Sequence, residues 1–166
     1  MFQEMRYRGP SLDDLHENYA KRHRIDEAAP IRSAHEVVID APAERVWTLL
    51  ADPAGWSAFD SAIHDVRVTG DGAVAVDTRF TWVNGRTTIA SRFAVVDPLH
   101  EITWTGSAMG SRAAHRHLIT TRQDGTTLLH TEESMAGTLL GLFYNSTKLH
   151  AELTRWLDSI KTAAEL

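Results

Sequence analysis

The strongest indication of the fold is in residues 137–166, which read GTLLGLFYNSTKLHAELTRWLDSIKTAAEL. Apolar side chains recur in this stretch every three or four positions, which is the spacing of one face of an α-helix. The pattern predicts a helix of roughly seven turns after Gly137. Its stripe consists of Leu139, Leu142, Phe143, Ser146, Leu149, Leu153, Trp156, Leu157 and Ile160. A stripe of this length needs a large apolar partner.

Alternating segments in the middle of the chain predict that partner, an antiparallel sheet. Strands are expected at residues 66–69, 74–83, 115–121 and 127–135, with further strand pattern between them. Turn signals separate the strands: Gly-Asp-Gly at 70–72, Asp-Pro at 97–98 and Asp-Gly at 124–125.

The Asn-Gly pair at positions 84–85 is a hairpin signal, because both residue types adopt the positive φ angles of a type I′ turn. A two-residue turn here would place Trp82 opposite Thr87 and Phe80 opposite Ile89. One face of the sheet would then carry Phe80, Trp82, Ile89, Ser91, Phe93, Ile102 and Trp104. This face is the expected partner of the terminal helix.

One strand and two short helices are expected ahead of these segments. From His35, alternation places Val37 and Ile39 on one side of a half-buried strand. Residues 42–50 then show helical spacing after a proline, and residues 54–63 predict a second short helix. The sequence therefore predicts an α+β domain over residues 34–166, with a curved antiparallel sheet wrapped around a long C-terminal helix.

Residues 1–33 differ from the rest, because they are dense in charged side chains and carry only a short helical pattern. Ser11 followed by Asp14 resembles a helix start, and Leu12, Leu15 and Tyr19 are spaced to share one side. We expect a partly ordered N-terminal arm. The alternatives are a lid and a contact between the subunits of a homodimer.

Composition restricts the class of protein. A chain of 166 residues with 43% hydrophobic content is long enough for one domain with a sizeable core. Its 17 basic and 22 acidic residues are scattered, so no basic face is expected for nucleic acid. It has no cysteine, which excludes disulfides and thiolate chemistry. No signal peptide or membrane span is expected, and the predicted location is the cytoplasm.

Several segments together resemble the START-like or Bet v 1-like superfamily and, within it, the bacterial polyketide cyclase/dehydrase (SRPBCC) group. They are residues 37–47 (VVIDAPAERVW), 52–56 (DPAGW), 80–82 (FTW), 104–106 (WTG) and 131–137 (TEESMAG), together with the Leu-rich terminal helix. The resemblance covers the chain from about Ser33 to its end and leaves the N-terminal arm outside.

This resemblance implies a helix-grip fold of about seven strands, with a deep cavity between the sheet and the C-terminal helix. It also implies that the cavity holds a small hydrophobic molecule that is polyketide-, aromatic- or lipid-like. The family includes cyclases, aromatases, dehydratases, lipid carriers and plain binding proteins on one scaffold, so the reaction has to come from the site residues. We expect either acid/base catalysis of the cyclase/dehydrase kind or a non-catalytic ligand carrier.

His115 and His117 alternate along one predicted strand and therefore share a face. If that face is concave, two imidazoles line the cavity and can move protons near neutral pH. If it is the other face, the pair is solvated. Ile119 shares their face and favours the inward orientation, whereas Leu118 on the opposite face argues the reverse.

A metal site is not expected, although His-x-His also begins the metal site of a cupin. Thr120, Thr121 and Arg122 stand where the next ligand would be needed. His130 is available on the neighbouring strand, yet nine histidines in one chain make chance spacings common. No cofactor is expected either.

Glu132 and Glu133 alternate, so one of them points inward. A two-residue turn at 124–125 would place His117 opposite Glu132, whereas the family pattern selects Glu133. We predict Glu133, because Leu129 and Met135 on its face make a better cavity wall. An inward Glu133 beside His115 is either an acid/base pair or a structural ion pair.

The predicted catalytic residues are thus His115, Glu133 and His117. Aromatic and apolar groups complete the predicted cavity, because large rigid faces supply contact area at little entropic cost. The predicted ligand-binding residues are Trp56, Phe59, Phe80, Trp82, Ile89, Phe93, Trp104, Met135, Phe143 and Tyr144.

Overall fold

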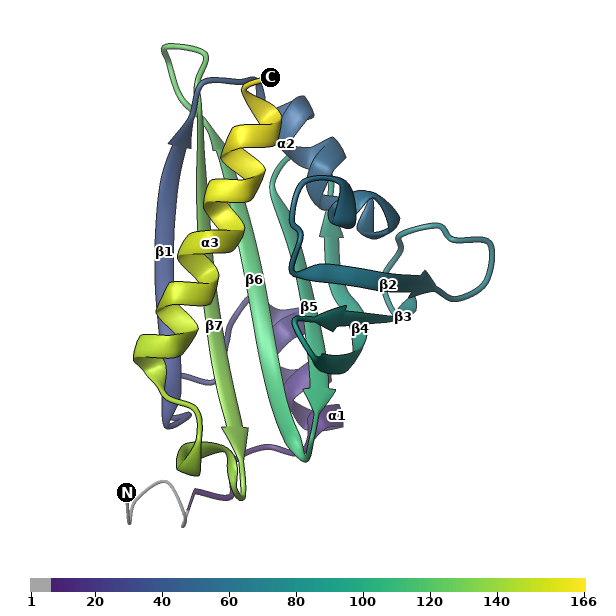
Figure 1. Cartoon of the computed structure of the whole chain (residues 1–166), viewed down its shortest axis with the longest axis vertical. Coiled ribbons are helices and arrows are strands. Elements are labelled where there is room, and N and C mark those ends of the chain that lie inside the picture. Colours follow the sequence, from purple (N-terminus) through teal and green to yellow (C-terminus); the bar gives the residue numbers. More distant parts are fainter. Residues whose placement is uncertain (1–6) are drawn as a thin grey trace.

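The protein is an α+β helix-grip fold built on one antiparallel sheet of seven strands, as the sequence predicted. The computed structural model describes residues 7–166. The strands are β1 (Ile31–Ile39), β2 (Ile63–Val68), β3 (Arg79–Asn84), β4 (Thr87–Asp97), β5 (Glu101–Ala108), β6 (Ser111–Thr121) and β7 (Thr127–Gly137). Their order is β1-β7-β6-β5-β4-β3-β2, so β1 and β2 form the two edges (Figure 1).

The terminal helix α3 (Ser146–Ala164) lies along one face of the sheet, which we call the inner face (Figure 1). Its buried stripe contains Leu149, Leu153, Trp156, Leu157 and Ile160. On the sheet, the predicted residues Phe80, Trp82, Phe93 and Trp104 belong to the same core as Trp156, Leu157 and Ile160. The apolar stripe of α3 therefore packs on the face of the sheet that the sequence predicted as its partner.

The prediction of a seven-turn helix from Gly137 was wrong at its start. α3 has 19 residues, about five turns, because Asn145 caps it: the Asn145 side chain accepts a hydrogen bond from the Lys148 N–H. The residues before the cap form a short 3-10 turn, η4 (Leu140–Leu142). As a result Leu139, Leu142 and Phe143 are exposed instead of buried in the stripe.

Two short helices follow β1 and close the upper end of the inner face. α2 (Ala43–Leu50) begins after Pro42, and η3 (Pro53–Ala58) is a 3-10 helix that buries Trp56 completely. The second helix ends at Ala58 instead of the predicted Ile63, which is the first residue of β2. Similarly, the strand expected from residue 74 begins only at Arg79.

The β3–β4 hairpin differs from its predicted register. Asn84 pairs with Thr87 and Trp82 with Ile89, so the turn residues are Gly85 and Arg86, not the Asn-Gly pair. Gly85 has the positive φ of +62° that such a turn needs, whereas Asn84 stays in the strand. Phe80 consequently pairs with Ser91 rather than with Ile89. The shift is by two residues, so every side chain keeps its predicted face.

The N-terminal segment from residue 7 to residue 30 covers the opposite, outer face of the sheet (Figure 1). It contains α1 (Leu12–Asp14), a π-helical turn η1 (Leu15–Tyr19) and a 3-10 turn η2 (Ala20–Arg22). Ser11 caps α1 as predicted, and Leu15 and Ile25 pack on Ala114 of β6. This part of the arm is folded onto the sheet. No helix among the described residues is both long and apolar enough to cross a membrane.

Candidate functional site

A cavity of about 170 Å³ lies between the inner face of the sheet and α3. It is larger than the roughly 150 Å³ that holds a benzene molecule, and smaller than the roughly 300–1,000 Å³ of sites for drug-sized ligands. Its wall consists of Trp56, Ile63, Trp82, Asn84, Thr87, Ile89, Ser91, Trp104, Gly106, Ser107, Ala108, Met109, Ser111, Ala113, His115, Glu133, Met135, Leu140, Phe143, Tyr144, Glu152, Leu153, Arg155 and Trp156.

Four tryptophans form the inner end of the cavity, and they come from four separate elements. The Trp56 ring lies 5.7 Å from Trp82, 5.2 Å from Trp104 and 5.3 Å from Trp156 between centroids. Three of the indole N–H groups are used within the protein: Trp56 donates to the Leu50 carbonyl, Trp82 to Ser91 Oγ and Trp156 to His117 Nε2. These three side chains therefore offer a ligand apolar ring surface rather than hydrogen-bond donors.

Seven of the ten predicted ligand-binding residues line the cavity: Trp56, Trp82, Ile89, Trp104, Met135, Phe143 and Tyr144. The other three lie behind the wall. Phe80 and Phe93 stack on each other at 4.5 Å with at most 1% of each exposed, and Phe59 stacks on Trp156. These three support the wall and do not reach the space inside it.

His115 lies on the inner face of β6 with a defined arrangement of its ring protons. Its Nε2 is 3.0 Å from Thr131 Oγ1, and the Thr131 hydroxyl itself donates to the carbonyl of Arg116. Nε2 therefore carries the proton, and the lone pair is on Nδ1. Burial lowers the pKa of His115 to about 3, so the ring is neutral at pH 7.

Glu133 lies directly opposite His115 in the β6–β7 pair. Its Oε2 is 3.4 Å from the unprotonated Nδ1 of His115, and the side chain is 10% exposed. Burial, followed by the charge of Glu152, raises the pKa of Glu133 to about 8. At pH 7 the pair therefore consists of a neutral imidazole and a largely protonated carboxyl group, and the two are not an ion pair.

The β6–β7 connection decides which glutamate points inward. Thr121 pairs with Thr127, so the loop has five residues and not the two of a tight turn at 124–125. His117 consequently faces Thr131 instead of Glu132. Glu132 lies on the outer face, where Arg116 Nη1 contacts its Oε1 at 2.6 Å.

His117 is on the inner face but does not line the cavity. It is fully buried, stacks on His115 at 4.4 Å between centroids, and accepts the Trp156 N–H at 2.8 Å. Burial, and after it the neighbouring His115, hold the pKa of His117 well below its usual value. Its position is that of a support for His115 and Trp156.

Two charged groups of the wall were not identified from the sequence as site residues: Glu152 and Arg155, both on α3. Glu152 stands one helical turn before Trp156, on the edge of the apolar stripe, and that spacing was the available signal. It lies close enough to Tyr144 that its charge, after burial, raises the pKa of the phenol. The Tyr144 hydroxyl is buried and has no well-formed hydrogen bond to a described residue.

Arg155 is the other charged group of α3 at the cavity, and it is already paired. Its Nη1 contacts both carboxylate oxygens of Asp60, whose side chain is 2% exposed, and its Nη2 donates to Asn84 Oδ1 at 3.2 Å. The positive charge of Arg155 is thus balanced before any ligand enters.

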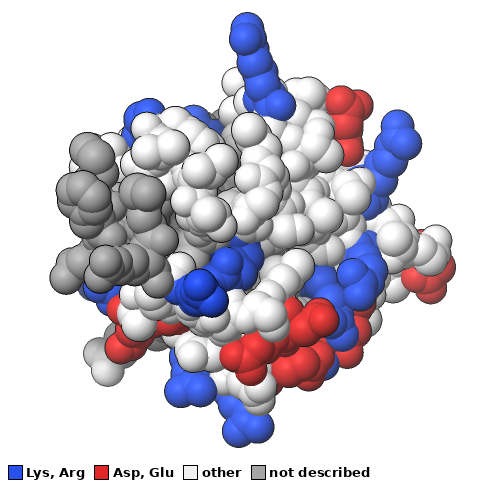
Figure 2. All heavy atoms as spheres, turned by 90° about the horizontal axis from the view of Figure 1, so that it is seen from below, with Lys and Arg blue, Asp and Glu red and all other residues white. Residues whose placement is uncertain are grey.

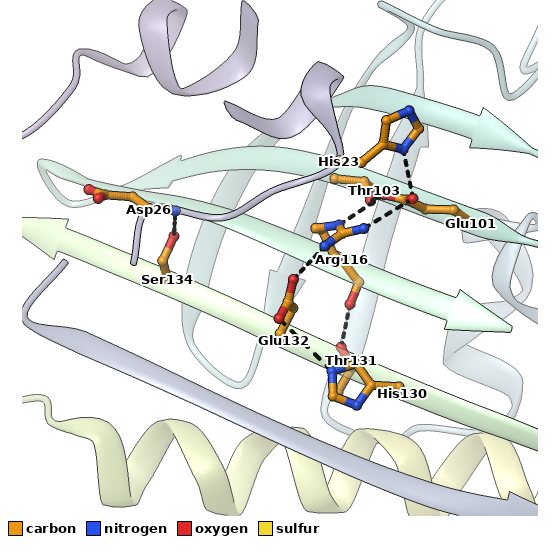
Figure 3. A network of polar contacts seen from close by, with 9 residues as sticks. All are labelled: His23, Asp26, Glu101, Thr103, Arg116, His130, Thr131, Glu132 and Ser134. Carbon is orange, nitrogen blue, oxygen red and sulfur yellow. Dashed lines mark hydrogen bonds and ion pairs between the residues drawn. The ribbon is translucent and has the colours of Figure 1, made fainter. Parts of the chain in front are cut away.

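The outer face carries a separate polar network, centred on Arg116 between Glu101 and Glu132 (Figure 3). His130 belongs to this side, near Glu36 and Glu132, and therefore does not join His115 and His117. Among the described residues, the potential metal-ligating group is His16, Glu17 and Asp77, also on the outer face. Lys21 and Arg92 contact Asp77 there, and their positive charges disfavour a cation.

The lower end of the cavity is bordered by the β5–β6 turn and the segment before α3. Met109 and Phe143 line it and are 80% and 50% exposed. Seen from this end, a broad area carries no Lys, Arg, Asp or Glu side chain, and the Asp and Glu side chains gather along one side (Figure 2). A ligand would therefore enter past an apolar rim.

Comparisons with known proteins agree with this fold. The profile described as "Polyketide cyclase / dehydrase and lipid transport" matches residues 30–165. A search of curated protein sequences gave no match.

Three solved structures illustrate the similarity of the fold. A hypothetical protein of Helicobacter pylori is 16% identical with a TM-score of 0.76, covering 84% of this chain and 91% of the other. The Zhui aromatase/cyclase from Streptomyces sp. R1128 is 19% identical with a TM-score of 0.62, covering 81% and 93%. A START superfamily protein from Mycobacterium smegmatis is 13% identical with a TM-score of 0.63, covering 81% and 94%.

Proposed function

Because the chain belongs to the polyketide cyclase/dehydrase and lipid transport family, we propose that its cavity binds a small, largely apolar molecule and promotes proton transfer on it. The proposed ligand is polyketide-, aromatic- or lipid-like, and the proposed reaction is of the cyclase/dehydrase kind. The observation that carries the proposal is the contact between Glu133 and His115 on the cavity wall, at 3.4 Å.

The protonation states of this pair suit acid/base work. A carboxyl group with a pKa of about 8 is present in both of its forms near neutral pH, which is the condition for an efficient general acid or base. As an acid, Glu133 gives its proton to a carbonyl oxygen or to a departing hydroxyl group. As a base, its carboxylate removes a proton from the carbon beside a carbonyl. Nδ1 of His115 faces the carboxyl group and can accept a hydrogen bond from its O–H, which holds the proton of Glu133 in place.

The other walls of the cavity would hold the substrate rather than react with it. The tryptophans offer flat apolar surfaces, and the low exposure of Glu133 keeps bulk water away from the reacting group. Ring closure in a poly-carbonyl chain requires three steps: abstraction of a proton next to one carbonyl, attack of the resulting enolate on a second carbonyl carbon with protonation of its oxygen, and loss of that oxygen as water. The fold supplies the enclosure and Glu133 supplies the exchangeable proton.

Deuterium exchange into 2-tetralone tests this proposal, because the ketone is bicyclic, apolar and enolisable. In D₂O the wild-type protein should accelerate exchange at the α carbon, with a rate that rises with pH through about 8. Glu133→Gln should lose about 100-fold or more of the acceleration. Glu132→Gln is the matched control, because Glu132 lies on the outer face, and it should keep the wild-type rate.

The outcomes separate the two functions of the family. Binding of 2-tetralone by calorimetry without faster exchange would make the protein a carrier. An undiminished rate in Glu133→Gln would remove Glu133 from the reaction. If neither binding nor exchange is detected with 2-tetralone, the cavity is not the site for small apolar carbonyl compounds that we propose.

A further inference from the structure

The cavity has an unbalanced charge. Two carboxyl groups, Glu133 and Glu152, line it from opposite walls, one on β7 and one on α3. The basic groups that line it are His115, which is neutral at pH 7, and Arg155, which is held by Asp60. No described lining residue therefore offers a free positive charge to an anionic ligand.

The polar groups around Glu133 also have only weak internal partners. Glu133 makes no hydrogen bond to a described residue beyond its 3.4 Å contact with His115, although its side chain is nine-tenths buried. The buried hydroxyl of Tyr144 makes no hydrogen bond of normal geometry, although Glu152 is close enough to act as a weak acceptor. Buried polar groups normally make strong hydrogen bonds, so weakly bonded ones in a cavity point to a ligand that bonds them better.

The aromatic groups next to these acids are suited to the same kind of ligand. The faces of tryptophan rings attract cations, and tryptophan does so more strongly than tyrosine or phenylalanine. Trp56, Trp82, Trp104 and Trp156 all line the space that Glu133 and Glu152 border. An aromatic cage with carboxyl groups at its edge stabilises an organic ammonium group and repels a carboxylate.

We propose that the cavity selects ligands by charge: it binds an apolar ring that carries an ammonium group in preference to a carboxylic acid of the same shape. This inference rests on the ligand-binding part of the proposed function and not on catalysis. In the proposed complex, Glu152 and Glu133 flank the ammonium group and the tryptophans enclose the ring. Fatty acids and other carboxylates are therefore excluded from the class of buried ligands.

Binding of a cation should also release the carboxyl proton of Glu133 to the buffer. The titratable and charged groups that line the cavity with Glu133 are His115 on β6, Tyr144 ahead of α3, and Glu152 and Arg155 on α3. Glu133 is largely protonated at pH 7, because burial and Glu152 oppose its charge. An ammonium group beside it stabilises the carboxylate, so the carboxyl proton leaves to the buffer.

The test compares three naphthalene derivatives of nearly equal size: 2-naphthylmethylammonium, 2-naphthylmethanol and 2-naphthoate. Isothermal titration calorimetry at pH 7 in phosphate and in Tris measures the affinity and the number of protons released. The ammonium compound should bind about tenfold tighter than the alcohol, and the alcohol tighter than the acid. The ammonium compound alone should release a large part of one proton.

Two variants connect the selectivity to the named residues. Glu152→Gln should reduce the preference for ammonium over alcohol about tenfold. Glu133→Gln should abolish the proton release. Asp158→Asn, on an exposed position of the same helix, is the control and should behave as wild type. The comparison of the three ligands on the wild-type protein stands even if a variant fails to fold.

Each result decides between the two proposals. Equal or tighter binding of 2-naphthoate would overturn the charge preference while leaving the cavity a ligand site, and so would an unchanged preference in Glu152→Gln. No detectable binding of any of the three compounds would overturn both the preference and the proposed function.

Discussion

Trp156 donates its indole N–H to Nε2 of His117 over 2.8 Å, and this hydrogen bond joins the terminal helix to the centre of the sheet. The bond requires His117 to be unprotonated at Nε2, which agrees with its lowered pKa. His117 in turn stacks on His115. His117 therefore contacts both Trp156 of the terminal helix and His115 of the acid/base pair, and so connects the position of α3 to the orientation of His115.

Trp156→Ala should lower the free energy of unfolding by roughly 3–5 kcal/mol, as large-to-small changes in a core do. Trp156 is 5% exposed and touches Trp56 and Phe59, so its removal leaves a large void. Trp156→Phe keeps most of the packing but leaves His117 without its donor, and should cost about 1–3 kcal/mol. Urea or guanidinium unfolding curves measure both. A loss below about 1 kcal/mol for the alanine variant would mean that the stripe of α3 is not buried.

Glu133 should make the protein less stable as the pH rises from 6.5 to 8. The pKa of Glu133 is about 8 in the folded state and near 4.5 in the unfolded state, so between these values the folded protein binds more protons. Stability therefore falls with rising pH across that window, by at most about 1.4 kcal/mol per pH unit.

Buried His115 and His117 have the opposite effect on stability, which rises with pH, but they have it below pH 6.5. His115 has a pKa of about 3 when folded and 6.5 as its ordinary value, so it removes stability as the pH falls below 6.5. Between pH 6.5 and 8 the effect of Glu133 is therefore seen without that of His115. Chemical unfolding at several pH values measures the free energy of unfolding of wild type and of Glu133→Gln. The value for Glu133→Gln minus the value for wild type should increase with pH. A constant difference would contradict the raised pKa.

Arg155→Met should destabilise the fold by about 3 kcal/mol, because it leaves the buried charge of Asp60 without a counter-charge. The value is at the low end for buried pairs, since the Arg155 side chain is 37% exposed. The double variant Arg155→Met with Asp60→Asn should recover part of the loss. Thermal unfolding of the three proteins tests the pair, and a double variant no more stable than the single one would show that charge is not the cause.

Leu15→Ala, in the N-terminal segment, should cost about 2–5 kcal/mol. Leu15 is 2% exposed and packs on Ala114 from the outer side of the sheet. Leu12→Ala, at a half-buried position in the same segment, should cost clearly less. Denaturant midpoints compare the two. If both variants unfold like wild type, the segment contributes nothing to the stability of the sheet.

The sequence predicted the sheet faces and the packing of the terminal helix, because both follow from periodicity. The errors in the register of the β3–β4 hairpin and in the length of α3 have local causes. Gly85 alone supplied the positive φ that the hairpin needed, and Asn145 capped α3 before the apolar pattern could extend it. A cap or a turn depends on one side chain, and a pattern of many residues does not reveal which of two arrangements it adopts.

The candidate site was harder to predict than the fold. Glu133 and His115 were named from alternation and from the family pattern, but their protonation states depend on burial, which only the packed structure gives. Glu152 was missed because a charged residue at the border of an apolar stripe ordinarily points to solvent. The ordered arm was also underestimated, since its few apolar residues, such as Leu15 and Ile25, are too widely spaced to suggest a second packed layer.

The placement of β1 beside β7 has a consequence for how the protein is made. Ile31 pairs with Met135, so the two strands are separated by roughly a hundred positions in the chain, and closing so long a loop is slow. On the ribosome, β1 emerges first of all the strands and has no neighbour until β7 has followed it. The first strand to be synthesised is therefore the last to be paired, and its exposed edge has to be kept from other chains in the meantime.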